Sequence, residues 1–394
     1  MTFCYNPDPD LDAQPQTPSQ TVEGLSVVIP TFRRTSLCET LLASLHESQS
    51  RCEAATEIWV IDDSPDPDAQ QIESACQRYG AHYIWHHGSV AQKRNVGVKH
   101  GQYPVVLFVD SDCRAESDLL QAHVQGYRSN KNTVAIVGKT EFEGPQNWLW
   151  HVVELTPYLD AFGIAHHQLQ VVWGPTNNLS CRKSVFEQVG GFDEHSPQPI
   201  GGEDADLGYR FYRQGYLMDT CPEAVVYHST QTWNTLGQLL QRLTRWCRGD
   251  IYLKQRYWTE LYYDCPSRFG MVLLLLLVAV VVSVDTSRLL WLLWPFIFVG
   301  VSIGSGVAQQ MWGSPRRLLK PVQVLAAEVI VLFYDACFLL HCGRSLCLKP
   351  LFASLLLRPE DALVIWECRT FQFWLRTAEV GISAWITMLF LSLR

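Results

Sequence analysis

The chain has 394 residues, enough for one large domain with additional segments or for two modest domains. Its formal net charge of -8 at pH 7 lacks the basic excess of a general nucleic-acid-binding protein, so we expect no nucleic-acid partner. Its 13 cysteines form no CxxC pair, which gives neither a zinc signature nor a disulfide framework and favours a reducing compartment.

Residues 1–24 are rich in Pro, Asp and Gln and contain no Lys or Arg. They lack the basic-then-apolar order of a secretory signal peptide. We therefore predict a disordered leader over 1–24, followed by a domain that begins in the cytoplasm.

Short apolar segments and helical segments alternate in the next part of the chain. Strands are predicted at 25–30, 58–61, 81–85 and 105–109. Helices are predicted after the capping-box pattern Ser36–Glu39, and at about 68–79, 92–100 and 118–127. This alternation predicts an α/β fold, with a mostly parallel sheet wound by helices whose ligands bind at the carboxyl ends of the strands. No Gly-rich phosphate loop follows the first strand, which argues against dinucleotide oxidoreductases and P-loop NTPases.

Two carboxylates follow the strand at 105–109. Asp110 and Asp112 are spaced i and i+2, which in a strand would place them on the same face. Oxygen ligands of this kind suit Mg²⁺ or Mn²⁺. The alternative is an acidic turn in which Ser111 or Asp112 caps the helix near Asp118. A second acidic strand end, Asp62-Asp63, is expected on the same edge of the sheet, and solubility alone does not account for two such ends.

A series of short motifs between about residues 25 and 230 resembles the family 2 glycosyltransferases, which have the GT-A fold. The motifs occur in the family's order and are Ser26–Thr31, Val60–Ser64, Lys93–Gly97, Val109–Asp112, Gly174–Ser180, Val189–Glu194 and Gly202–Leu207. The resemblance implies a GT-A domain over 25–232 that binds a nucleotide-diphospho-sugar donor and a divalent metal, Mg²⁺ or Mn²⁺.

The resemblance also implies roles for individual residues. The metal ligands would be Asp110, Asp112 and His228, although a histidine at a strand end is often structural. Asp62 or Asp63 would contact the base or ribose. The full set implied in nucleotide-sugar binding is Pro30, Thr31, Arg33, Asp62, Asp63, Lys93, Arg94, Asp110, Trp173, Asn177, Arg245 and Trp246. For Lys93 and Arg94 the alternative is a solvated helix face, and for Trp173 it is a place in the core.

An acidic pair follows Gly201-Gly202. By the resemblance, one carboxylate takes the proton from the acceptor hydroxyl, and we assign this general base to Asp204, with Glu203 as the second candidate. Inversion at the sugar carbon needs only one base opposite the leaving group. The alternative is two acids in a first helical turn, where the helix dipole favours them.

The segment 233–268 combines an apolar stripe with basic residues, as in amphipathic helices on a membrane surface. Processive family members carry a QxxRW motif in this region. Here Arg245-Trp246 is present, but Arg242 stands where the glutamine belongs. We therefore expect transfer of one or a few sugars rather than polymer synthesis.

The region 269–394 contains four hydrophobic segments, at about 270–284, 289–308, 322–340 and 378–393. Glu328 and Asp335 interrupt the third, and the loops on both sides of it, 313–321 and 341–376, are basic. Whether the third segment crosses the bilayer, re-enters it or lies in its plane is open at this point. We expect a multi-pass protein of the inner or plasma membrane with a cytoplasmic catalytic domain.

The resulting functional prediction is a membrane-bound, inverting, metal-dependent glycosyltransferase. Its acceptor would be a hydroxyl of a lipid, a lipid-linked saccharide or a cell-surface glycan. One alternative is a polyprenyl-phosphate sugar transferase, in which a phosphate replaces the acceptor hydroxyl. Another is a non-catalytic subunit of a membrane transporter that senses nucleotide-sugars.

Overall fold

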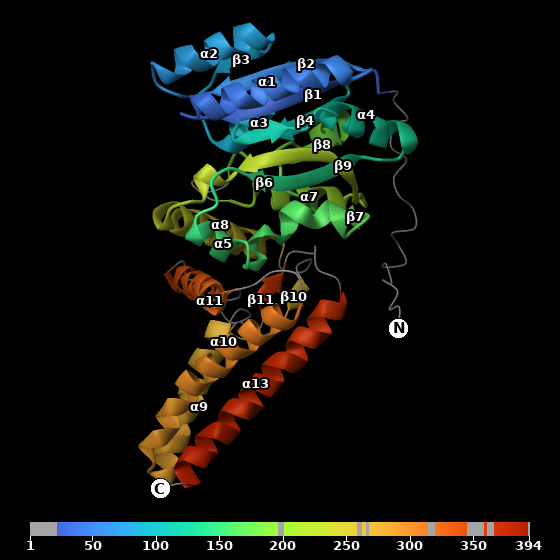
Figure 1. The fold of residues 1–394 in the computed structure, drawn as a ribbon. Coiled ribbons are helices and arrows are strands. Elements are labelled where there is room, and N and C mark those ends of the chain that lie inside the picture. The colour runs from blue at the N-terminus through green and yellow to red at the C-terminus, as the bar shows by residue number, and fades with distance from the viewer. Residues whose placement is uncertain are drawn as a thin grey trace. The chain divides into compact units, whose positions relative to one another are not determined.

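The computed structural model describes residues 22–195, 201–257, 262–264, 268–313, 320–344, 358–360 and 366–392 (Figure 1). Most of the expected leader lies outside them. The chain divides into two compact units: the first contains Met1–Pro145 and Leu159–Asn234, and the second contains Gln146–Tyr158 and Thr235–Arg394. The second unit thus includes a segment, 146–158, that the sequence motifs placed within the first domain.

The first unit is built on a nine-stranded mixed sheet, in the order β3-β2-β1-β4-β8-β6-β9-β5, with β7 paired to β9. Its strands are β1 (Gly24–Thr31), β2 (Ala55–Asp62), β3 (His82–Trp85), β4 (Val105–Val109), β5 (Cys113–Ala115), β6 (Ala135–Glu143), β7 (Gln170–Val171), β8 (Asn178–Arg182) and β9 (Met218–Ser229). The neighbours β3, β2, β1 and β4 are parallel, whereas β8 runs antiparallel to β4 and β6. The predicted α/β sheet wound by helices is confirmed.

The helices of the first unit connect and cover these strands. They are α1 (Thr35–Arg51), α2 (Asp68–Tyr79), α3 (Val90–His100), α4 (Leu119–Ser129), α6 (Lys183–Gln188) and α7 (Glu203–Arg213). The apolar positions of α1, Leu41, Leu42 and Leu45, are fully buried in the core shared with β1, β2 and β4. Each such side chain contributes about 1.5–3 kcal/mol when it is removed from water.

The capping prediction for α1 is wrong. Its N-cap is Arg34, which makes no side-chain cap hydrogen bond, so Ser36 already lies inside the helix. A capping box occurs instead at α3, where the Ser89 side chain accepts from the Gln92 backbone and the Gln92 side chain accepts from Ser89.

In the residues that the structure describes, the second unit is helical apart from one short pair of strands. It contains α5 (Trp148–Val153), α8 (Leu236–Arg256), α9 (Arg268–Thr286), α10 (Trp294–Gly313), α11 (Pro321–Arg344) and α13 (Trp366–Ser392), with β10 (Tyr262–Asp264) paired to β11 (Arg358–Glu360). Arg268–Thr286, Leu289–Ala308 and Pro321–Arg344 are each long and apolar enough to cross a membrane, and Thr377–Ser392 is a shorter apolar helix. The hydrophobic segments expected from the sequence therefore fold as helices.

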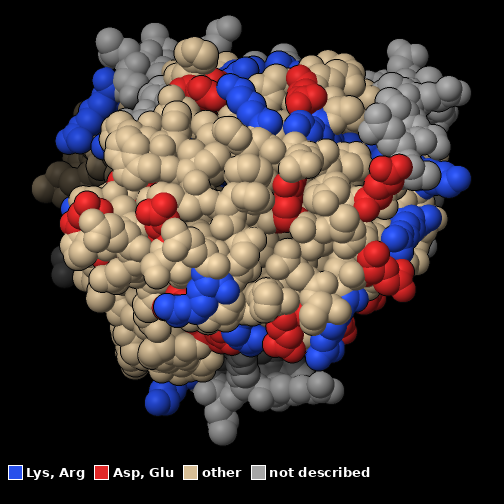
Figure 2. Space-filling view, turned by 90° about the horizontal axis from the view of Figure 1, so that it is seen from above, with Lys and Arg blue, Asp and Glu red and all other residues tan. Residues whose placement is uncertain are grey.

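The charged surface agrees with the composition. Figure 2 shows one face of the molecule, on which Lys and Arg side chains are interspersed with Asp and Glu side chains. This face has no broad basic patch of the kind that attracts the phosphates of nucleic acids.

Candidate active site

The candidate site begins at the turn between β4 and β5. The five residues of β4 are buried, and the strand ends at Val109. The backbone N–H of Cys113 donates to the carbonyl of Asp110 at 3.0 Å and closes the turn. Because the chain turns here, the i and i+2 rule for a strand does not govern Asp110 and Asp112, and their carboxylates take different partners. The alternative of a helix cap is wrong, because β5 follows directly and α4 begins only at Leu119.

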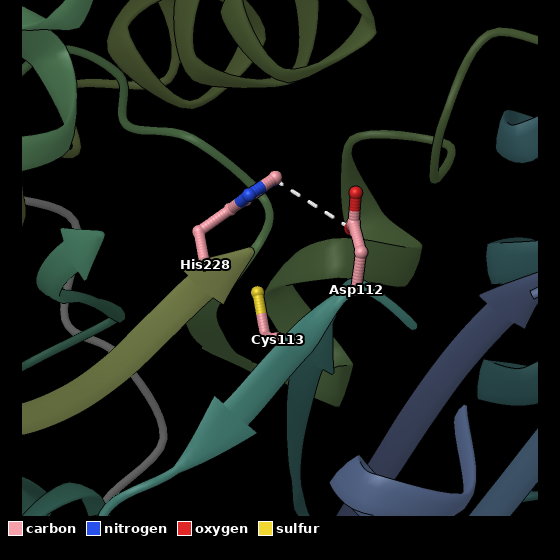
Figure 3. A group of neighbouring side chains, drawn as sticks. All are labelled: Asp112, Cys113 and His228. Atoms are coloured by element: carbon pink, nitrogen blue, oxygen red, sulfur yellow. Dashed lines mark ion pairs between the residues drawn. The ribbon is translucent and has the colours of Figure 1, made fainter. Parts of the chain in front are cut away.

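Asp112 lies with Cys113 and His228 in a buried group whose possible ligand atoms are all within 4.8 Å of one another (Figure 3). The group exists because Cys113 and His228 are directly opposite each other in the antiparallel pair of β5 and β9. The Asp112 Oδ1 atom is 3.5 Å from Nε2 of His228 and 2.9 Å from Nη1 of Arg34.

The donor set of this group fits a divalent cation. His228 Nδ1 is 3.1 Å from the carbonyl oxygen of Ser229, to which a protonated Nδ1 can donate, leaving the lone pair of Nε2 on the side of Asp112. A carboxylate oxygen and an imidazole nitrogen are both ligands of Mn²⁺-type ions, and Cys113 adds a softer sulfur atom. Burial, with the charges of Asp112 and Asp110, raises the pKa of the Cys113 thiol.

Arg94 connects the turn after β4 to the start of α7. Its guanidinium is almost fully buried and donates to Asp110 at 2.8 Å and to Glu203 at 2.7 Å. It also lies over the Phe192 ring, 5.4 Å from its centroid. The alternative of a solvated helix face is therefore wrong for Arg94. Asp110, predicted as a metal ligand, stays outside the group of Asp112, Cys113 and His228 in the described residues.

The start of α7 separates the two candidate bases. Its N-cap is Gly202, whose φ of +88° lies in the left-handed region that glycine adopts without strain. Glu203 is ion-paired with Arg94, whereas the Asp204 carboxylate accepts a hydrogen bond from the backbone N–H of Ala205 at 2.9 Å. Burial, reinforced by the Glu203 carboxylate, raises the pKa of Asp204 to about 7. This value suits a group that must take up a proton near neutral pH.

A second cluster joins the ends of β1 and β2. Lys93 is buried, donates to the carbonyl of Thr31 at 2.7 Å and pairs with Asp63, so the solvated alternative is wrong for Lys93 too. Asp62 is fully buried, and its oxygens accept from the Ser64 N–H, the Ser64 hydroxyl and the Tyr83 hydroxyl. Because those oxygens are committed to the fold, Asp63 is the freer carboxylate for a ligand.

The other residues of this cluster form its outer edge. The Ser64 hydroxyl accepts from the backbone N–H of Arg33 at 2.7 Å, which holds Arg33 at a φ of +53°. Pro30 is buried in β1 opposite Ile61. Phe32 is 49% exposed, with the Arg33 guanidinium 5.2 Å from its ring centroid.

Trp173 and Asn177 are buried within the first unit. A Cβ placed at Gly208 of α7 would lie 2.3 Å from the Trp173 Cβ, so the segment that carries Trp173 and the helix approach closely there. Asn177 donates to the Thr140 hydroxyl at 2.9 Å. The alternative of a core position therefore describes Trp173, which is 9% exposed. Arg245 and Trp246 belong to α8 in the second unit, where Trp246 contacts Tyr158 and Arg242, and their role remains a prediction.

Three polar neighbours of Asp112 were not predicted. Arg34 is ion-paired to it, although the sequence pointed to Arg33, and the Thr232 hydroxyl donates to Asp112 Oδ2 at 3.2 Å. Cys113 is the third. Of the three, only Cys113 had a signal in the sequence, its position directly after Asp110-Ser111-Asp112. The pairing of β5 with β9 cannot be seen in the local sequence.

Comparison with known proteins gives a consistent set of relatives. Residues 26–191 match the family described as glycosyl transferase family 2. Validoxylamine A glucosyltransferase from Streptomyces hygroscopicus subsp. jinggangensis is 26% identical over 228 residues, covering 51% of this chain and 54% of that protein. Glucosyl-dolichyl phosphate glucuronosyltransferase from Haloferax volcanii is 28% identical over 138 residues, covering 32% and 42%.

The chain spans about half the length of the curated relatives it matches. Among solved structures, mannosyltransferase PcManGT from Pyrobaculum calidifontis in complex with GDP-Man and Mn²⁺ superposes with a TM-score of 0.42 at 14% sequence identity. That superposition covers 92% of this chain and 86% of the other.

Proposed function

Because residues 26–191 form a family 2 glycosyltransferase domain, we propose that this chain transfers a sugar from a nucleotide-diphospho-sugar to an acceptor hydroxyl, with inversion at the sugar carbon. The acceptor is a lipid, a lipid-linked saccharide or a cell-surface glycan. Transfer is non-processive, because Arg242 replaces the glutamine of the processive motif.

The observation that carries this proposal is the Arg94 bridge. It ties Asp110, beside the candidate cation site, to Glu203, beside the candidate base. One buried guanidinium thereby fixes the two parts of the chemistry relative to each other, and preorganised charge of this kind is a large term in catalysis.

Asp112 and His228 hold the cation in this proposal, with Asp110 close by in the same turn. A bound Mg²⁺ or Mn²⁺ supplies positive charge to the diphosphate leaving group as the glycosidic bond breaks. Asp63, with Lys93 and Thr31, contacts the nucleoside at the ends of β1 and β2. Asp204 accepts the proton of the acceptor hydroxyl, and its pKa of about 7 favours this exchange.

Attachment to a membrane supports a lipid-linked or surface acceptor. Within the described part of the chain, three helices of the second unit are long and apolar enough to span a bilayer. We propose that the helices of this unit anchor the chain in the inner or plasma membrane with its catalytic unit on the cytoplasmic side, where nucleotide-sugars would be its donors.

The test is turnover of a panel of UDP-, GDP- and dTDP-sugars by the full chain in detergent, with Mn²⁺ or with a chelator, beside the Asp112→Asn variant. The expected result is release of one nucleoside diphosphate that requires the cation and is lost in the variant. Turnover unchanged by chelator and by the substitution would overturn the cation assignment. Binding of a nucleotide-sugar without turnover, with lipid and glycan acceptors present, would instead support a sensing subunit.

A further inference from the structure

The strands before α9 and α13 fix where these two helices begin. Tyr262–Asp264 pairs antiparallel with Arg358–Glu360, in the register Tyr262 to Glu360 and Asp264 to Arg358. α9 begins a few residues after β10, at Arg268, and α13 begins a few residues after β11, at Trp366. Because the two strands form one ribbon, α9 and α13 begin at the same end of the helical bundle, which we call the ribbon end.

Side-chain contacts fix the directions of the helices. The Trp294 indole N–H donates to the Ser383 hydroxyl at 3.1 Å, and Ser305, further along α10, hydrogen bonds to Glu379, which is earlier in α13. α10 and α13 are therefore antiparallel. Arg288, in the turn between α9 and α10, donates to the carbonyl of Leu391 at 3.4 Å, so α13 ends beside that turn, at the end opposite the ribbon.

α11 does not run along this bundle in the same way. Glu328 is ion-paired to Arg268, the first residue of α9, and a Cβ at Gly306 of α10 would overlap its carboxylate. Tyr334 hydrogen bonds to Asp250 of α8 and contacts the Tyr158 ring. α11 thus packs at the ribbon end, against α5 and α8. In Figure 1, the axes of α9, α10 and α13 are aligned with one another, and the axis of α11 lies at a steep angle to them.

The buried face of α11 carries polar residues among apolar ones, whereas an apolar stripe is exposed. Its buried face carries the polar residues Gln323, Glu328, Tyr334 and Asp335. Its exposed large apolar residues recur every three to seven positions on the other face: Val322, Leu325, Val329, Phe333 and Leu340. A helix in water places its apolar face inward. This exposed stripe therefore fits hydrocarbon, and exposed apolar residues of the contacting helix α9, such as Leu277 and Val281, extend the same kind of surface.

We infer that the chain crosses the membrane three times, by α9, α10 and α13, and that α11 lies in the leaflet at the ribbon end with its apolar stripe against lipid acyl chains. This inference rests on the membrane attachment proposed above. α13 has 27 residues, about 40 Å at 1.5 Å per residue; its apolar part, Thr377–Ser392, would lie in the bilayer, and the charged turns before it, with Arg369 and Arg376, at the ribbon end. Its Glu379 is 1% exposed and faces α10 rather than lipid.

The distribution of charge supports the inference independently. Segment 313–320 contains Arg316, Arg317 and Lys320 with no acid. Segment 341–376, which includes the end of α11 and the first turns of α13, contains five Lys or Arg residues against three Asp or Glu residues. Short cytoplasmic loops carry an excess of Lys and Arg. If α11 lies in the plane, both basic segments fall on one side, whereas a crossing α11 would put them on opposite sides.

Topology mapping of the full chain in bacterial cells tests this arrangement. Alkaline phosphatase, which is active only after export, or green fluorescent protein, which fluoresces only in the cytoplasm, is fused after Arg394. Separately, a specific protease site is inserted after Lys349. Three crossings predict phosphatase activity without fluorescence, and cleavage at the inserted site only in inverted membrane vesicles. A fluorescent fusion, with cleavage only from the outside, would show that α11 crosses and overturn the inference. Release of the chain by alkaline carbonate would overturn the membrane attachment itself.

A matched pair of lysine substitutions tests the position of α11. Val278→Lys places a charge in the middle of α9, and Val329→Lys places one in the exposed stripe of α11. A lysine in an in-plane helix can extend to the headgroups, whereas one in the centre of a span cannot do so easily. We expect Val278→Lys to reduce membrane-inserted protein several-fold and Val329→Lys to leave most of it. Equal losses would contradict the in-plane position.

Discussion

Single buried charges define the candidate site more sharply than the acidic motifs do. Asp62 and Asp63 are adjacent in sequence, yet Asp62 is locked by Ser64 and Tyr83 while Asp63 meets Lys93. Glu203 and Asp204 divide in the same way, because Arg94 engages only the first. In both pairs the partner decides which carboxylate is available for chemistry.

The Asp204→Asn substitution tests the assignment of the general base. Loss of a positioned base lowers a rate by about 10²–10⁴-fold, so we expect kcat to fall by that factor while donor binding remains. In the unsubstituted chain the rate should rise with pH through about 7 and then level, as Asp204 loses its proton. Glu203→Gln serves as the comparison. A variant of Asp204 with near-normal kcat, or a rate independent of pH between 6 and 8, would contradict the assignment.

His123 links stability to pH at a position away from the chemistry. It is fully buried between Ser180 and Asn178, and burial lowers its pKa from 6.5 to about 4. Between those values the unfolded chain holds a proton that the folded chain does not, so stability is complete above 6.5 and is lost as the pH falls toward 4. By pH 5 this loss amounts to about 2 kcal/mol.

Thermal unfolding in detergent at pH 7.5 and pH 5 measures this loss. His123→Gln cannot take up the proton, so its melting temperature should fall less between the two pH values than that of the unsubstituted chain. The same fall in both proteins would assign the pH dependence to other groups.

At the scale of strands and helices, much of the fold could be predicted from the sequence. Helix α2 and strand β4 occur at the predicted bounds, because apolar periodicity and turn residues act locally. The turn after β4 could not be predicted in the same way. The side chains of Asp110 and Asp112 were expected on the same face of a strand. Instead the chain turns after β4, and β5 pairs with β9, which is more than 100 residues later in the sequence. The contact of Cys113 with His228 depends on the same long-range pairing, and that of Arg34 with Asp112 on the pairing of β1 with β4.

The packing of α3 on β1 gives a prediction at this scale. A Cβ at Gly97 would lie 2.3 Å from a methyl group of Val28, whereas a Cβ at Gly237 of α8 would meet nothing within 4 Å. Overpacking costs about 1–3 kcal/mol, which exceeds the helix-propensity gain of up to about 1 kcal/mol on replacing glycine. We expect Gly97→Ala to lower the melting temperature by several degrees and Gly237→Ala to leave it unchanged or higher. A stabilised Gly97→Ala would show that β1 and α3 are less tightly packed than described.

At the scale of the whole molecule, the first unit is not one continuous piece of chain. Segment 146–158 leaves it between β6 and β7, and its α5 packs on α11. Trp150, Val152 and Val153 are buried in that helix. The polypeptide therefore passes between the two units three times, after Pro145, Tyr158 and Asn234, rather than once.

This interruption predicts the behaviour of a truncated chain. A chain cut after Asn234 keeps α5 but loses α8 and α11, so the buried residues of α5 become exposed. We expect that fragment to aggregate in size-exclusion chromatography, and Trp150→Ser with Val153→Ser to recover part of the soluble monomer. A soluble, monomeric fragment without these substitutions would show that α5 does not depend on the second unit.

The ribbon of β10 and β11 also sets an order of events during synthesis. The hairpin of α9 and α10 can form as soon as it leaves the ribosome, because its contacts are local. β10 emerges just before that hairpin, but its pairing strand β11 is translated only after α11. The backbone groups of β10 that pair with β11 therefore have no such partner while α9, α10 and α11 are translated. The contacts of the helical bundle are completed only after α13 has been translated.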